Sequence, residues 1–213
     1  MKKILYLLAA AAVGVAVAFP SSASANSIFP SLISVAPSGT NFLYTYQLLL
    51  DAAQEISTTT GVGGQPPVPS FATVYDFVGL VGAPTCTALV ANLTCTGSTA
   101  LVGPTPALEA PADSALVPNI TATFSTPAGI VVGPGTPLTP IADLYALSTF
   151  GTPLRVANNF AAQATNAITG LDFGTPAANA TSASVPSVPE PGSLVLLGTG
   201  LIGLVLARRR IDR

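Results

Sequence analysis

Proline and glycine recur through the centre of this chain and set the main limit on its fold. The sequence has 20 prolines and 19 glycines in 213 residues. Proline removes a backbone donor, and both residues interrupt regular elements, so clusters of them mark turns. Such clusters fall at 61–69, 103–106, 133–140, 150–153 and 173–176. Long helices are therefore excluded over most of the central part of the chain.

Short runs of β-branched and aromatic residues lie between these turns and predict strands. In the run 42–50 the alternate residues should share one face, opposite Thr45 and Gln47. These alternate residues are Phe42, Tyr44, Tyr46, Leu48 and Leu50. In the run 71–78 the residues expected to face away from Asp76 are Phe71, Thr73, Tyr75 and Phe77.

Further strands are expected at 120–124, 129–132 and 143–149. For 159–168 the alanines and glutamine also suit a short helix, and we favour a strand. Many short strands separated by turns indicate an all-β fold. We therefore predict a single antiparallel β-sandwich-like domain over 26–174, followed by a flexible stalk of small residues and prolines over 175–188.

The first 25 residues have the pattern of a secretory signal peptide. Lys2 and Lys3 precede an apolar run that is too short for a comfortable membrane span. The run is followed by Ala23-Ser24-Ala25, which has the small residues required at a signal-peptidase site. We expect cleavage after Ala25, which leaves Asn26 as the first residue of an exported chain. An uncleaved amino-terminal anchor is the alternative.

The charge between residues 26 and 188 excludes several functions. Arg155 is the one base there against seven acids, a formal charge of −6. Nucleic-acid binding needs a basic surface and is excluded. The sequence has no histidine, and this region has no lysine, so most acid–base and nucleophilic arrangements lack members. We predict that the protein is not an enzyme and needs no cofactor or metal.

The two cysteines are predicted to form a disulfide. Cys86 and Cys95 are separated by eight residues, and an exported chain meets oxidising conditions. The alternative, a metal or redox pair, lacks both a C-x-x-C spacing and a histidine partner. A bond that closes a loop of this size contributes about 2 to 3 kcal/mol in the chain-entropy account.

The carboxy-terminal residues form a three-part tail over 189–213. The segment Val188-Pro189-Glu190-Pro191 precedes an uncharged apolar run over 193–207. A basic end over 208–213 follows, beginning with Arg208, Arg209 and Arg210. An uncharged run ended by arginines predicts a stop-transfer signal with the arginines in the cytoplasm. At 15 residues the run is short for a membrane helix, which suits a temporary anchor.

This tail resembles the PEP-CTERM sorting signal of Gram-negative bacteria. The resemblance implies recognition of Pro189, Glu190 and Pro191 by an exosortase, a membrane peptidase that processes the protein near the motif. It also implies that residues 193–207 hold the precursor in the inner membrane before release towards the cell surface. Signal peptidase, an exosortase-type peptidase and the inner membrane are therefore the expected partners.

The central part is also similar to a recurring group of proteins with this tail. Two segments carry that resemblance, 71–77 (FATVYDF) and 117–121 (VPNIT). It implies a shared extracellular β domain and names no ligand.

Three roles follow for the β domain. The first is a structural or interaction role at the cell surface or in the exopolysaccharide matrix. The alternative is a carbohydrate or small-ligand binding module that uses exposed aromatic residues (Tyr44, Tyr46 and Tyr75) or acidic loops, with calcium at Glu109 and Asp113 as a variant. A third, catalytic reading requires Asp51, Glu55 and Asp76 to converge in one cleft. Exposed aromatics would favour binding, whereas buried ones favour a structural role.

Overall fold

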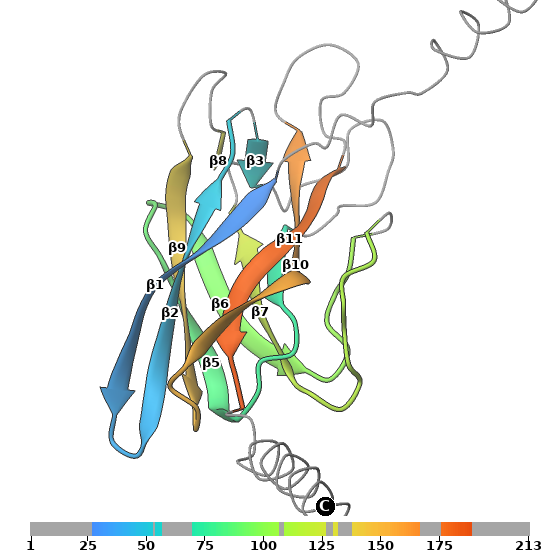
Figure 1. The fold of residues 1–213 in the computed structure, drawn as a ribbon. Helices are drawn as coiled ribbons and strands as arrows, with labels where there is room; N and C mark the ends of the chain where they lie inside the picture. The colour runs from blue at the N-terminus through green and yellow to red at the C-terminus, as the bar shows by residue number, and fades with distance from the viewer. Residues whose placement is uncertain are drawn as a thin grey trace, which may run out of the picture.

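The computed structural model is all-β in the parts of the chain that it describes. These parts are residues 27–52, 54–56, 70–106, 109–126, 130–131, 138–166 and 176–188. Eleven strands form two antiparallel sheets, so the predicted all-β antiparallel class is confirmed (Figure 1). Within the described ranges, no helix has the length and apolar character needed to cross a membrane. The predicted signal peptide and membrane run lie outside these ranges.

The four-stranded sheet has the order β1-β2-β9-β5. Its members are β1 (Ile28–Ser38), β2 (Asn41–Leu50), β9 (Thr139–Ser148) and β5 (Leu80–Ala88). The turn between β1 and β2 has Gly39 at φ 62°, a left-handed conformation that glycine adopts without a steric cost. Strands far apart in the sequence, β2 and β9, form the centre of this sheet.

The seven-stranded sheet has the order β6-β7-β4-β10-β3-β8, and β11 pairs with β10. Its members are β6 (Thr94–Ala100), β7 (Asn119–Ser125), β4 (Phe71–Val74), β10 (Pro153–Asn166), β3 (Gln54–Ile56), β8 (Ile130–Val131) and β11 (Pro176–Pro186). The strand expected at 159–168 is thus confirmed as far as Asn166. Its neighbour β11 follows it along most of its length (Figure 1).

The two sheets enclose one hydrophobic core. From the four-stranded sheet it contains Tyr44, Tyr46, Leu48, Leu50, Ile141 and Leu144. From the seven-stranded sheet it contains Ala72, Val74, Ile120, Phe124, Phe160 and Val185. The alternation expected for 42–50 is confirmed, because Tyr44, Tyr46, Leu48 and Leu50 are fully buried, whereas Phe42 is partly buried. The alternation at 120–124 also holds.

The face predicted for 71–78 is wrong for most of its residues. Ala72 and Val74, the intervening positions, are the ones that lie in the shared core. Regular pairing ends at Val74, and Asp76 has φ 56°, so the chain bends and Phe77 turns into the core. A left-handed residue changes which side the following side chains occupy, which explains Phe77. Thr73 and Tyr75 lie on the side away from the shared core, where their hydroxyls donate to the Pro104 carbonyl of the covering loop.

The predicted stalk is also wrong over most of its length. Residues 176–186 form β11, which pairs with β10 from Thr165 to Pro153. Ala183 and Val185 are buried in the core, and the side chain of Asn159 accepts a hydrogen bond from the Ala183 N–H at 2.7 Å. Pairing with a neighbouring strand overrides the weak strand preference of this small-residue sequence.

Candidate functional site

The cysteines form the predicted disulfide, which joins the two sheets. Cys86 lies in β5 of one sheet and Cys95 lies in β6 of the other, with their Cα atoms 5.4 Å apart. Near the bond, Gly97 lets the two strands approach closely, because a Cβ there would lie 2.5 Å from the carbonyl oxygen of Pro84. The bond therefore closes one side of the sandwich at a point where both strands are sheet edges.

The tyrosines proposed as a sugar-binding surface are buried. Tyr44, Tyr46 and Tyr75 have no exposed surface. Tyr44 and Tyr46 pack on the ring of Phe77, with ring centroids 5.4 and 6.4 Å away. Burial raises the pKa of each tyrosine, and for Tyr46 the pKa is well above its usual value. These rings cannot stack on a sugar in this fold.

The hydroxyl of Tyr46 reaches across the sandwich to the last strand. It donates a hydrogen bond to the carbonyl oxygen of Ser184 in β11 at 2.6 Å. The neighbouring hydroxyl of Tyr44 is buried and has no hydrogen-bond partner among the described residues. Tyr44 and Tyr46 therefore pack in a similar way, but only the Tyr46 hydroxyl makes a described hydrogen bond.

The bend at Asp76 holds a long loop against the outer face of the seven-stranded sheet. The Asp76 N–H donates to Oδ1 of Asn119 at 2.8 Å, and Oδ1 of Asp76 accepts from the Ser114 N–H at 2.9 Å. Nδ2 of Asn119 donates to Oδ1 of Asp113 at 2.9 Å. These contacts join the segments 71–77 and 117–121, which carried the second family resemblance. Their described contacts are structural.

The three carboxylates considered for catalysis are not all brought together, because Asp76 lies far from Glu55. Glu55 in β3 pairs with Thr165 of β10, whereas Val74, just before Asp76, pairs with Phe160. Five residues along a strand span about 16 Å, and Asp76 lies beyond that distance. Partial burial raises the pKa of Glu55. Over the described ranges, no three His, Cys, Asp or Glu side chains are grouped to hold a metal ion.

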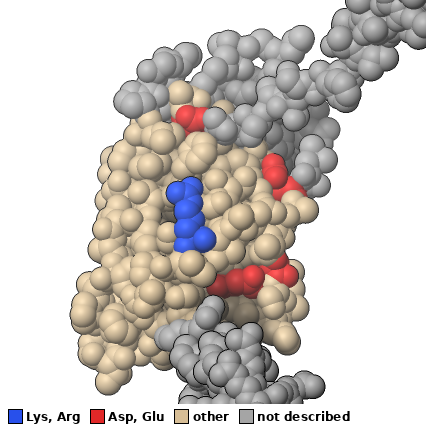
Figure 2. Space-filling view, viewed as in Figure 1, with Lys and Arg blue, Asp and Glu red and all other residues tan. Residues whose placement is uncertain are grey.

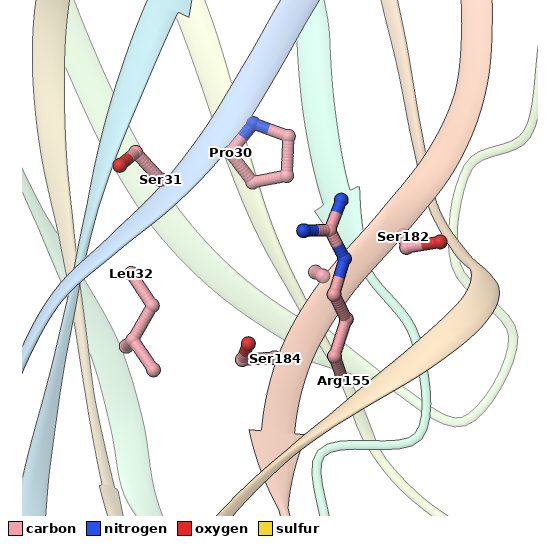
Figure 3. A pocket seen from close by; sticks show the side chains of 7 residues that line it. Pro30, Ser31, Leu32, Arg155, Ser182 and Ser184 are labelled. Carbon is pink, nitrogen blue, oxygen red and sulfur yellow. The ribbon is translucent and has the colours of Figure 1, made fainter.

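A polar groove between β1 and β11 is the candidate site that sequence reasoning missed. It has a volume of about 250 Å³. Its lining residues are Pro30, Ser31, Leu32, Arg155, Ser182, Ala183 and Ser184. Figure 3 shows the Arg155 side chain running over β11, with its guanidinium group between Pro30 and Ser182. The one available signal was that Arg155 is the sole base between residues 26 and 188.

The groove separates two strand edges that do not pair with each other. The Ser27 carbonyl accepts from the Asp51 N–H at 3.0 Å, whereas the next carbonyl, of Ile28, accepts from Nδ2 of Asn179 at 3.1 Å. Alternate residues of β1 therefore direct their backbone polar groups towards β11. Pro30 occupies one of these outward positions and has no N–H to leave unpaired.

Electrostatically, the groove is a small positive site on an acidic surface. Arg155 is the one basic residue in the described ranges, and Figure 2 shows it as an isolated blue side chain, with tan residues between it and the red acids on that face. The Arg155 guanidinium in this groove offers fixed donors to a carboxylate, sulfate or phosphate.

The last described residues lead directly into the predicted sorting tail. β11 ends at Pro186, the Ser187 N–H donates to the Thr152 carbonyl at 2.9 Å, and the Val188 side chain is 54% exposed. Pro189, Glu190, Pro191 and the arginines from 208 to 210 lie outside the described residues, as do Ala23, Ala25 and Asn26 at the other end of the chain.

Comparison with known families identifies this tail. The PEP-CTERM protein-sorting motif matches residues 187–210. The chain is a PEP-CTERM domain-containing protein. The match begins one residue after β11 ends, so in this PEP-CTERM protein the folded strands and the motif are directly adjacent.

The motif has general consequences for a PEP-CTERM protein. It marks chains that are exported, that are anchored in a membrane as precursors and that are processed by an exosortase. Neither a search of curated proteins nor a search of solved structures returned a match to this PEP-CTERM protein.

Proposed function

We propose that this PEP-CTERM protein is a non-catalytic structural or interaction protein of the cell surface or exopolysaccharide matrix. The match of the sorting motif at 187–210 carries the proposal, because this motif marks proteins that are exported and then processed. The tail is removed near Pro189-Glu190-Pro191 after residues 193–207 have held the precursor in the inner membrane. The mature β domain then acts outside the cell.

The organisation of the β domain supports a structural role. Most of its described aromatic residues are buried, although Phe29, Phe42, Tyr145 and Phe150 are only partly so, and the disulfide ties the two sheets together. The described loop around Asp76 uses its polar side chains to hold itself in place. Low charge, frequent prolines and a covalent link suit a protein that resides for long periods outside the cell.

A non-catalytic role is supported by the side chains that the chain has. The sequence has no histidine, and the region from 26 to 188 has no lysine. A hydrolytic mechanism would bring the carboxylates of Glu55 and Asp76 together. Glu55 pairs with β10 at Thr165, whereas the strand that leads to Asp76 pairs with β10 around Phe160. Hydrolysis of a glycoside requires two carboxyl groups within about 5 to 10 Å of each other.

The sorting part of the proposal is tested by intact mass and cell fractionation. In the native host, wild type should lose its tail near Pro191 and reach the surface or medium. A variant with Glu190→Ala and Pro191→Ala should remain in the inner membrane with Arg213 intact. Retention of Arg213 in the membrane-bound wild type would overturn the proposal. The matched control is Glu109→Ala with Pro111→Ala, which removes the same two residue types outside the matched motif.

A second candidate function is favoured by the Arg155 groove. It would make the domain a binding module for an anionic extracellular ligand, such as the carboxylates of an acidic polysaccharide. Binding should be lost in Arg155→Gln, retained in part in Arg155→Lys, and weakened by salt because it depends on one charge pair. Polygalacturonate is a suitable probe, with dextran as the neutral control. Equal binding by Arg155→Gln and wild type would refute this function.

A further inference from the structure

The chain leaves the sandwich towards the sorting motif at one end, after β11. We name this end the exit end and define it as residues 37–42, 78–80, 149–154 and 186–188. The strand register brings these segments together, since Phe42 and Leu80 both pair with Ser148 and Pro153 pairs with Pro186. The Thr149 N–H donates to the Gly79 carbonyl at 2.9 Å, which joins two of the segments.

The exit end carries no ionisable side chain. It exposes apolar residues instead, with 56% of Leu154 and 54% of Val188 accessible to solvent. Asp51 and Glu55 lie at the opposite end, where β2 finishes and β3 begins, and the nearest described charged residues in sequence are Asp76 and Arg155, just outside the exit-end segments. An uncharged, partly apolar surface is not repelled by the anionic headgroups of a bacterial membrane, whereas carboxylates are.

The chain that leaves the exit end is short. Ser187 is the last described residue whose backbone N–H bonds to the sheet region, and the uncharged run begins at Ser193, six residues later. Six residues reach at most about 20 Å. A headgroup layer occupies about 5 to 8 Å of that length. The exit end therefore lies within about 15 Å of the membrane surface whenever the run is in the membrane.

The same limit fixes which end faces the membrane. β2 has ten residues, which span about 33 Å, more than the length of the tether. The sandwich cannot turn the end that carries Asp51 and Glu55 towards a membrane to which the exit end is tethered. We propose that the exit end lies against the lipid surface in the anchored precursor, with Leu154 and Val188 in contact with the headgroup region. This inference depends on the proposed function, in which the tail anchors the precursor.

The chain has no tryptophan, so a single introduced tryptophan reports its own position. The full-length precursor is reconstituted in liposomes of phosphatidylethanolamine and phosphatidylglycerol that contain headgroup spin-labelled lipid. Leu154→Trp and Val188→Trp report on the exit end. Leu138→Trp is the matched control, since Leu138 is 45% exposed and precedes Thr139, the partner of Leu50 at the opposite end.

We expect the spin label to quench the emission of Leu154→Trp and Val188→Trp and to leave Leu138→Trp unchanged. A glycine-serine linker of about 20 residues after Val188, with an end-to-end distance of about 25 Å, should reduce the quenching. If the precursor floats with the liposomes and all three tryptophans behave alike, this inference is overturned and the proposed function stands. If the precursor does not float with liposomes, the anchoring itself is overturned, and the inference with it.

Discussion

Tyr44 and Tyr46 allow the contribution of one hydrogen bond to be measured against a neighbouring control. Both side chains are fully buried on β2, and their rings lie 6.4 Å apart. Substitution by phenylalanine keeps the ring and its contact with Phe77 and removes only the hydroxyl. In Tyr46→Phe the Ser184 carbonyl loses its donor, whereas in Tyr44→Phe a buried hydroxyl without a described partner is removed.

The two substitutions should therefore change stability in opposite directions. Leaving a buried carbonyl without its donor costs about 1 to 3 kcal/mol. Removing a buried hydroxyl that makes no hydrogen bond relieves a desolvation cost, so Tyr44→Phe should be neutral or about 1 kcal/mol stabilising. For a domain of this size 1 kcal/mol corresponds to about 2–4 °C in Tm. Tyr46→Phe should thus lower Tm by several degrees.

Urea unfolding of the chain spanning residues 26–188, followed by circular dichroism, measures both free energies. The m-value should be the same in both variants, because neither changes the surface exposed on unfolding. Equal destabilisation by the two substitutions would refute the reasoning, because it would mean that the Tyr44 hydroxyl has a partner or that the Tyr46 bond contributes nothing. The double variant tests whether the two effects add.

Four other perturbations have expected outcomes. Replacing Cys86 and Cys95 by serine should lower the unfolding free energy by about 2 to 3 kcal/mol in the same urea assay, and a smaller loss would mean that the reduced chain retains the loop. Gly97→Ala should cost about 1–3 kcal/mol, because its Cβ would meet the backbone of β5; an unchanged urea midpoint would contradict this close approach. Asn119→Ala should free the loop that ends before β7, detected as faster limited proteolysis between residues 101 and 118, with no change expected in the control Thr123→Ala. Burial raises the pKa of Tyr44, Tyr46 and Tyr75 in the folded state above the unfolded value of about 10. Their contribution to the unfolding free energy is therefore complete below pH 10 and falls as the pH rises above 10, most of all for Tyr46. Thermal melts from pH 7 to 11 should show this fall, and a flat profile would contradict it.

Sequence alone predicted the elements whose side chains alternate strongly. β2 and β7 have apolar residues at every second position, and a period of two is readable without any partner strand. The disulfide was predictable because spacing and compartment agreed. The sorting tail was predictable because its three parts occur in a fixed order and need no tertiary contact to be recognised.

The missed features depend on contacts between distant residues. β11 contains mainly alanine, serine, threonine and asparagine, and its pairing with β10 makes it a strand. The hydroxyl of Tyr46 and the carbonyl of Ser184 are 138 residues apart in sequence. The bend at Asp76 depends on the side chain of Asn119, 43 residues later. A local sequence pattern does not predict contacts between residues that are this far apart in the chain.

The position at which β11 ends separates the fold from its delivery signal. The core residues Ala183 and Val185 and the hydrogen bond from Tyr46 all lie before residue 187, where the motif begins. Trimming the chain after Val188 would keep every described core side chain and every described sheet pairing. We therefore expect the described sandwich to keep its stability after the cut and to be deliverable by a different tail.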